Sequence, residues 1–562
     1  MKRGSGGESE SASRSVSFLT EPGDVRRDDF DETRARGGGM KKNLHGSSSW
    51  SEGMARSASF VAFALVAFAL APAGSSLPVS LDDALRDAAS RAARDARYVV
   101  DLRRELHRHP ELQWAEFRTS AVVKRELRAM GVAHRDVAPP GVLATIGTGA
   151  APAVLLRADM DGLPILEAAD VPEHLRSEIY GKMHACGHDG HVAMLLGAAK
   201  HLAARFEKND DPTNGPGLLN GTVYLVFQPA EEGGAGAARM LDEGLARLDP
   251  PPAAAFAAHL WPYPETPSGV VGVVRDGAAM AGSAAFEITI EAAPSSFHTT
   301  DDDDAPTKKK VPRGTSMGSS SNNGGLLSRE RGDASAVACA ASVAQNLQGV
   351  VARRVDPLES ALITVSAVRA GAVFPSTGSS EGDDTARGDR RKKTGAGARL
   401  VGQFHATSPS VFGALFDWVR SAAVSAATSA GCAAPLVDFE PRLVGGVPRR
   451  HYPPTVNDAG AAALALEVGR AMFGAADVRS PAPAMPGEDF GFFAARWPSA
   501  MAWVGAHNAS AGAVWPLHSD KYVLDEGVLH RGVAMHVGFA TAFLTRGGFR
   551  EGGGRVADDA EL

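Results

Sequence analysis

Three imidazoles, one thiol and one carboxylate fall within eight residues of this chain, from His184 to His191. Histidine and cysteine number only 17 and 3 among 562 residues, so this density is unlike the rest of the sequence. Thiolate, neutral imidazole and carboxylate are common protein ligands of metal ions. In an extended loop, the spacing of Cys186 and His188 places both side chains on one side, facing one ion. The stretch predicts a metal site, in which His184 and His191 either bind metal or orient its ligands.

An adjacent pair of carboxylates, Glu231 and Glu232, forms a second cluster further along the chain. One carboxylate of such a pair can hold a metal ion while its neighbour takes a proton from water, whose pKa the metal lowers toward about 7. Asp161 could orient a ligand or steady this base, and Asp159 is the less specific of the two. Two acids on a turn are also common on protein surfaces, so position must decide between these interpretations.

Predicted strands deliver these side chains to one edge of a sheet. From about residue 90 to 280, short apolar runs alternate with helical periodicity, which predicts an α/β fold with a largely parallel sheet between helices. The predicted strands that precede polar side chains are 153–156, 222–227 and 254–258. Asp159 and Asp161 follow the first, the glutamate pair follows the second, and His259 follows the third. Since open α/β sheets bind ligands at the carboxyl ends of their strands, we expect these side chains to meet there.

The candidate ligands outnumber those of a structural zinc site. They are Cys186, His188, Glu232, His259 and His518. A lone histidine is more often structural; His259 gains from its place after a strand, whereas His518 has no spacing argument of its own. Five donors exceed the four of a closed zinc site, which favours an open hydrolytic site with two metal ions.

Composition limits the folded part of the chain. Residues 1–53, 292–332 and 376–398 are polar and rich in Ser, Gly and charged residues, so they bury too little surface to offset the entropy of ordering. The remainder suits two domains, because 283–450 reads as a small α+β unit of alternating strands and helices. The net charge of −7 is spread along the chain, so nothing indicates a nucleic-acid partner.

An apolar run at 60–71 is too short to span a bilayer comfortably but fits the central region of a signal peptide. Read from Met54, it has a positive start and small residues after it, so either translation starts at Met54 or the run stays as a membrane anchor. We therefore expect a protein of the secretory pathway, in the endoplasmic reticulum lumen or secreted. Cys339 and Cys432 could pair in an oxidising compartment or remain buried thiols, and the sequence leaves both open.

Seven motifs resemble, in order and spacing, the aminoacylase/carboxypeptidase-type metallopeptidase family. They are 157–164, 183–191, 227–233, 259–261, 452–458, 488–490 and 516–519. The nearest branch is the plant IAA-amino acid hydrolases (amidohydrolases of auxin conjugates), and the similarity runs from about residue 98 to 545. The resemblance implies a zinc-peptidase-like catalytic domain with a mostly parallel sheet and an inserted α+β, ferredoxin-like lid domain. The implied boundaries are 1–80 for an N-terminal extension, 90–282 and 451–548 for the catalytic domain, 283–450 for the lid and 549–562 for a tail.

The same resemblance implies the chemistry. Two divalent ions, most often Mn²⁺ with Zn²⁺ or Co²⁺ as alternatives, would be held by the five candidate ligands. Glu231 matches the general base and Asp161 the carboxylate that supports the site. The implied reaction hydrolyses the amide between an acyl group, such as indole-3-acetyl, and an amino acid. The partner is then a small-molecule N-acyl amino acid, with no membrane partner beyond the segment at 60–71. A homodimer is a further possible assembly.

The expected lid departs from the family pattern in three places. The family's Gly-Gly-His-Ala-Ala segment is replaced by 293–298, Asn-Val-Ile-Pro is reduced to 373–375, and Gly-Thr-x-Arg becomes Gly-Gln-Phe-His at 402–405. These lid positions normally help to bind substrate and polarise its carbonyl. One alternative to the amidohydrolase is therefore a metal-binding member with impaired catalysis. A general carboxypeptidase or dipeptidase is a second, independent alternative.

Overall fold

The computed structural model describes residues 80–206, 219–275, 277–291, 323–371, 397–441 and 449–549. These residues belong to one compact unit, 76–562. The apolar run at 60–71, the tail and most of the two polar stretches lie outside the described residues. Among the helices of the described ranges, none is both long enough and apolar enough to cross a membrane.

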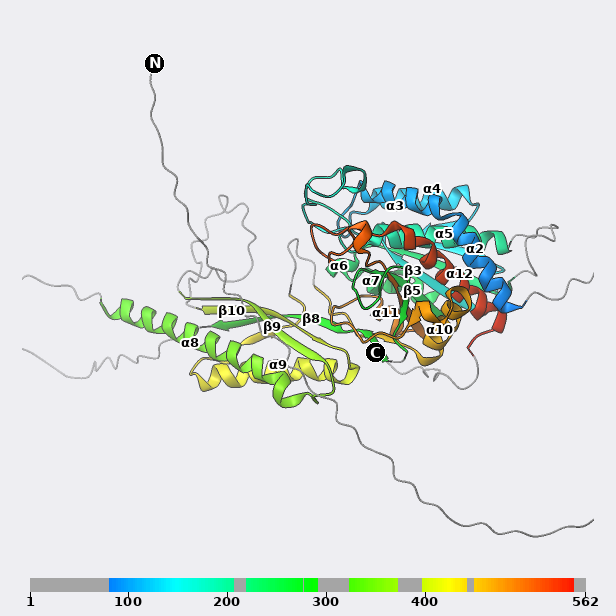
Figure 1. Cartoon of the computed structure of the whole chain (residues 1–562). Helices are drawn as coiled ribbons and strands as arrows, with labels where there is room; N and C mark the ends of the chain where they lie inside the picture. The colour runs from blue at the N-terminus through cyan, green and yellow to red at the C-terminus, as the bar shows by residue number, and fades with distance from the viewer. Residues whose placement is uncertain are drawn as a thin grey trace, which may run out of the picture. The chain divides into compact units, whose positions relative to one another are not determined.

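Strands β3 and β5 lie among the helices at the centre of the larger part (Figure 1). They belong to an eight-stranded sheet with the order β1-β2-β4-β3-β5-β14-β6-β13. The strands are β1 (Ala133–Asp136), β2 (Val142–Gly147), β3 (Ala153–Asp159), β4 (Thr222–Gln228), β5 (Pro252–Trp261), β6 (Val271–Val273), β13 (Val478–Arg479) and β14 (Ser499–Gly505). The four central strands, β4, β3, β5 and β14, pair in parallel, whereas β1 and β2 add antiparallel pairings at one edge. This confirms the predicted α/β class with a mostly parallel sheet.

Both faces of this sheet are buried, because alternate residues of each central strand enter different apolar clusters. Val154 and Leu156 of β3 pack in the cluster formed with the larger helices, whereas Leu155 packs in the opposite cluster. The larger helices are α2 (Leu81–Arg94), α3 (Ala96–His107), α4 (Phe117–Ala129), α5 (His188–Phe206), α10 (Ala459–Phe473) and α12 (Leu529–Arg546). The opposite face is covered by α7 (Gly236–Glu243) and α11 (Gly491–Ala494).

The strands and the helix reach further toward the predicted site than the sequence indicated. β5 ends at Trp261, so His259 lies inside the strand and not after it. The reason is the partner strand β14, which continues the parallel ladder through His259 to Trp261. Asp159 is likewise the last residue of β3, and α5 begins at His188. Asp161 and the Glu231–Glu232 pair do follow their strands directly.

A second, four-stranded antiparallel sheet has the order β11-β8-β10-β9. Its elements follow in the chain as β8 (Gly282–Glu291), α8 (Asn323–Arg354), β9 (Ala361–Gly371), β10 (Gly397–Ala406), α9 (Pro409–Ser429) and β11 (Leu436–Asp438). Figure 1 shows α8 and α9 running along these strands, and they share one apolar cluster with them. This chain order is the β-α-β-β-α-β ferredoxin-like pattern that was predicted. α8 begins at Asn323, within the polar stretch 292–332. The apolar periodicity in the sequence predicts only the later part of this helix.

Cys339 in α8 and Cys432 after α9 form a disulfide, with their Cα atoms 6.4 Å apart. The bond resolves the alternative that the sequence left open and leaves Cys186 as the free thiol. It closes a loop with a sequence separation of 93 residues, so it restricts the unfolded chain strongly. We expect reduction, or Cys432→Ser, to lower the free energy of unfolding by about 2–4 kcal/mol, measured by urea denaturation.

The control is the Cys339→Ser, Cys432→Ser double variant, whose stability should not respond to a reducing agent. Mass spectrometry after alkylation of the denatured, unreduced protein should find a single modified cysteine, Cys186. Three modified cysteines would contradict the pairing.

Candidate metal centre

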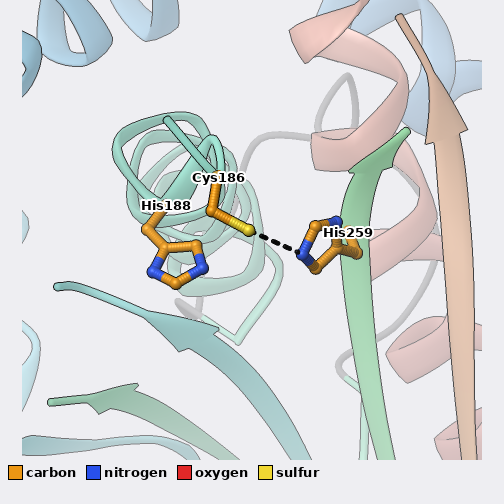
Figure 2. Close-up of side chains that lie close together, drawn as sticks. All are labelled: Cys186, His188 and His259. Carbon is orange, nitrogen blue, oxygen red and sulfur yellow. Dashed lines mark hydrogen bonds between the residues drawn. The ribbon is translucent and has the colours of Figure 1, made fainter. Parts of the chain in front are cut away.

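The beginning of α5 brings Cys186 and His188 to the same side. Gly187 between them has φ +83°, a left-handed conformation that residues with a Cβ rarely adopt. A Cβ at this position would also lie only 3.0 Å from the Tyr522 hydroxyl. Figure 2 shows both side chains at the start of the helix, with Cys186 directed at His259 of β5. The Cys186 Sγ and the His259 Nε2 are 3.7 Å apart.

The turn after β4 brings the two glutamates to His188 from another direction. Nε2 of His188 lies 3.9 Å from Glu231 Oε2 and 4.0 Å from Glu232 Oε1. Glu232 Oε1 also lies 3.0 Å from His518 Nε2, although the side chain of His518 is half exposed. Asp161 Oδ1 approaches the other ring nitrogen of His188 at 3.3 Å. The five candidate ligands, the candidate base and the supporting carboxylate therefore lie together near the carboxyl ends of β3, β4 and β5. They are Cys186, His188, Glu232, His259, His518, Glu231 and Asp161.

Potential ligand atoms of these residues fall into three overlapping groups, each within 4.8 Å. The groups are Cys186 with His188 and His259, Cys186 with Glu232 and His518, and His188 with Glu231 and Glu232. Both ring nitrogens of His188 and one oxygen of Glu232 are buried without a hydrogen bond of good geometry. Such atoms are costly unless a partner binds them, and thiol, imidazole and carboxylate donors suit divalent cations. The residues therefore fit a metal centre, and the shared ligands Cys186 and His188 fit two neighbouring ions.

His191 has both ring nitrogens occupied. Its Nδ1 lies 2.6 Å from Asp159 Oδ1, and its Nε2 accepts the Leu260 N–H at 2.9 Å. An acceptor role for Nε2 leaves the proton on Nδ1, which donates to Asp159. His191 therefore supports the neighbouring strand ends and is not free to bind metal. His188 differs, because neither of its ring nitrogens has a hydrogen bond of good geometry. His184 is buried, and none of the groups found among the described residues includes it.

The adjacent glutamates differ in their electrostatic environment. Burial, Glu488 and Glu232 raise the pKa of Glu231 well above its usual value. Burial acts in the same direction on Glu232, but His518, His188 and Cys186 together lower its pKa below the usual value. Two carboxylates whose pKa values are pushed apart suit different roles. Glu232 is suited to hold a cation and Glu231 to take up a proton.

A buried arginine beneath the site was missed by sequence reasoning. Arg157 of β3 is 2% exposed and donates to Asp159 at 2.6 Å, and to Glu488 and Asp489 at 2.9 Å. Its Nε also donates to Gln228 at 2.9 Å. The available signal was an arginine within a strand that is otherwise apolar up to Asp159. Arg157 balances the carboxylates that would otherwise repel one another below the candidate metal ligands.

We expect Arg157→Met to lower the free energy of unfolding by about 3–5 kcal/mol, because it leaves buried carboxylates without their partner. Urea denaturation of the purified variant would measure this. Arg125→Met is the matched control: Arg125 pairs with Glu105 and Glu126, but its side chain is 50% exposed. An exposed pair contributes at most about 1 kcal/mol. Equal stability of the two variants would mean that Arg157 does not balance the buried acids.

Comparison with known proteins identifies the class. The model of Peptidase family M20/M25/M40 matches residues 155–542. IAA-amino acid hydrolase ILR1-like 6 of Arabidopsis thaliana is 33% identical over 451 residues, covering 80% of each chain. Thermostable carboxypeptidase 1 of Saccharolobus solfataricus is 29% identical over 458 residues, covering 80% of this chain and 96% of the relative. The chain belongs to the M20 family and is a hydrolase.

The structure of a dinuclear metal-binding M20 peptidase from Bacillus subtilis agrees with this membership. It matches with a TM-score of 0.56 and 25% identity, covering 80% of this chain and 98% of that structure. The family resemblance drawn from the seven motifs is thereby confirmed.

Proposed function

We propose that this protein is a metal-dependent amidohydrolase that releases the acid and the amino acid from N-acyl amino acids, foremost IAA-amino acid conjugates. The observation that carries the proposal is the convergence of the thiol, imidazole and carboxylate donors around His188, with Glu231 beside them. The plant IAA-amino acid hydrolase relative, at 33% identity, supports this substrate class over the carboxypeptidase relative at 29%.

Two divalent ions, with Mn²⁺ as the first choice and Zn²⁺ or Co²⁺ as alternatives, would be held by the five ligands Cys186, His188, Glu232, His259 and His518. When bound, they would supply a Lewis acid that polarises the amide carbonyl and makes water more acidic. His259 is prepared for such a role, because its Nδ1–H donates to the Leu260 carbonyl at 2.8 Å. The lone pair of its Nε2 then faces Cys186.

Glu231 is the residue that we assign to proton transfer. It takes a proton from the attacking water and returns it to the leaving amine, the task of a general base that becomes a general acid. Asp161 positions it: one carboxylate oxygen accepts the Glu231 N–H at 3.0 Å and the other accepts the Glu232 N–H at 2.9 Å. The backbone of both glutamates is therefore fixed by one side chain that follows the neighbouring strand.

The experiment must also distinguish two alternatives: a metal-binding member whose altered lid impairs catalysis, and a general carboxypeptidase or dipeptidase. The segment 402–405 lies in β10, where Nδ1 of His405 is buried without a hydrogen bond. The segments 293–298 and 373–375 lie outside the described residues. We expect the protein with Mn²⁺ to release IAA from IAA-Ala, and acetate or benzoate from N-acetyl or benzoyl amino acids, but not to cleave dipeptides with free amino termini.

Other results would select the alternatives. Cleavage of free dipeptides without cleavage of N-acyl amino acids would indicate a carboxypeptidase or dipeptidase. Stoichiometric metal without product from any substrate would indicate a metal-binding family member with impaired catalysis.

We also propose a location in the secretory pathway. The disulfide between Cys339 and Cys432 supports it, because such bonds persist mainly in oxidising compartments. The apolar run at 60–71 that predicted this location lies outside the described residues, and the homodimer stays a prediction.

A further inference from the structure

Tyr452 lies where the chain returns from the second sheet to the main sheet. It pairs with Ser283, at the start of β8: the Ser283 N–H donates to the Tyr452 carbonyl at 2.9 Å, and the Tyr452 N–H donates back at 2.8 Å. The two connections between the sheets are thus bonded side by side, and we call this place the crossover, residues 281–283 and 452–454.

The crossover is tightly packed. A Cβ on Gly282 would lie 2.7 Å from Cδ of Pro454 and 2.9 Å from the ring of Phe412, which belongs to α9. Contacts below 3.0 Å force atoms to move, so a residue larger than glycine would displace the crossover. The backbone of Tyr452 is therefore fixed by its pairing with the start of β8, and the residues beside it are closely packed against α9.

The side chain of Tyr452 reaches the turn that carries the two glutamates. Its hydroxyl donates to the Glu231 carbonyl at 2.6 Å and accepts the N–H groups of Gly233 at 2.9 Å and Ala235 at 3.1 Å. The hydroxyl thus binds three backbone groups within five residues. It is buried, since the whole residue is 6% exposed. Water therefore has little access to replace these bonds.

The turn needs such support. Ala230 and Ala235, on either side of it, have φ of +57° and +52°, a left-handed conformation that is unfavourable for residues with a Cβ. The conformation persists only where surrounding contacts hold it. Besides Tyr452, the described side chains bonded to its backbone are Glu116, whose Oε1 accepts the Ala230 N–H at 2.7 Å, and Asp161. Glu116 directly precedes α4 and Asp161 follows β3, so both belong to the main-sheet part.

We infer that Tyr452 is a positioning residue that ties the orientation of Glu231 and Glu232 to the crossover between the two sheets. The inference rests on the proposed function, in which Glu231 transfers the proton and Glu232 holds a cation. A displacement of the second sheet, for example when substrate binds, then moves the base and a ligand together. A misplacement of 1 Å at a reacting group can cost about 10²-fold in rate, so the linkage has a measurable effect.

Tyr452→Phe tests the linkage, because it removes only the hydroxyl and keeps the ring against Phe492. We expect kcat for N-acyl amino acids to fall about 10- to 100-fold with KM nearly unchanged. The matched control is Tyr224→Phe in β4, whose buried hydroxyl donates to the Pro250 carbonyl at 3.0 Å, away from the turn. This control should keep the kcat of the unaltered protein.

The visible absorption spectrum of the Co²⁺-loaded protein is a second readout that needs no turnover. Tyr452→Phe should change the bands that report the ligand geometry around Glu232, and Tyr224→Phe should not. If the unaltered protein hydrolyses no N-acyl amino acid, the proposed function fails while the spectrum still decides the linkage. A Tyr452→Phe protein with the kcat and spectrum of the unaltered protein would overturn the inference.

Gly282→Ala perturbs the same linkage from the other end, and it also serves if Tyr452→Phe does not fold. Its added Cβ displaces the crossover but touches none of the glutamates. We expect it to lower kcat and alter the Co²⁺ spectrum in the same direction, and to have little further effect on kcat in the Tyr452→Phe background. Fully additive effects of the two substitutions, or an unchanged spectrum in Gly282→Ala, would overturn the role of Tyr452 as the connection.

Discussion

Glu231→Gln is expected to lower kcat by about 10²- to 10⁴-fold, the range that proton transfer by a positioned side chain contributes. Glutamine keeps the size of the side chain and the backbone bonds to Asp161, but it cannot take up a proton. KM should change little, because the metal ligands and the surface that binds the substrate remain. Steady-state kinetics on IAA-Ala with Mn²⁺ would measure both constants.

The metal content of Glu231→Gln should equal that of the unaltered protein, since Glu232 and not Glu231 contacts His518 and is the assigned ligand. Glu243→Gln in α7 is the matched control, because Glu243 is an exposed glutamate paired with Arg239. It should retain full activity. Retention of more than a tenth of the kcat by Glu231→Gln would assign proton transfer to another group.

The donors can be placed at one edge of the sheet from the sequence alone, because each polar residue lies at or near the end of a locally recognisable strand. The runs 153–156 and 223–227 are continuously apolar and fully buried, so both strands could be predicted without tertiary information. The strand that contains His259 was predicted too short. Its last residues are defined by pairing with β14, which lies more than two hundred residues later in the chain. Register between distant strands leaves no local pattern.

The contacts that orient the donors are even harder to predict from the sequence. Arg157 meets Glu488 and Asp489 across more than three hundred residues, and the Tyr452 hydroxyl reaches Glu231 across more than two hundred. Each of these residues appeared in a motif, but a motif does not state which partner a side chain meets. The same holds for His191: the sequence left open whether it binds metal or orients a ligand, and only the bonds to Asp159 and Leu260 show that both nitrogens are occupied.

Substitution of Cys186 by serine together with His188 by alanine is expected to remove the bound metal. These two residues recur in the donor groups that define the centre. Among the groups found in the described residues, their loss leaves only the all-carboxylate group of Glu231, Glu488 and Asp489. Metal analysis of the unaltered protein should find about two divalent ions per chain, as in dinuclear hydrolytic sites. The double variant should hold far less than one and should show no hydrolysis above background.

The loss of metal should also appear in stability, which needs no substrate. A ligand at about 100 times its dissociation constant stabilises the folded state by about 2.7 kcal/mol, so Mn²⁺ should raise the Tm of the unaltered protein. The double variant should show no such rise, whereas His134→Ala, a half-buried histidine of β1, should respond like the unaltered protein. If the double variant keeps its metal and its Mn²⁺-dependent Tm, the donors around His188 do not form the metal centre. The assignment of Glu231 would then lose its basis, because its proton transfer depends on the acidified water that this centre supplies.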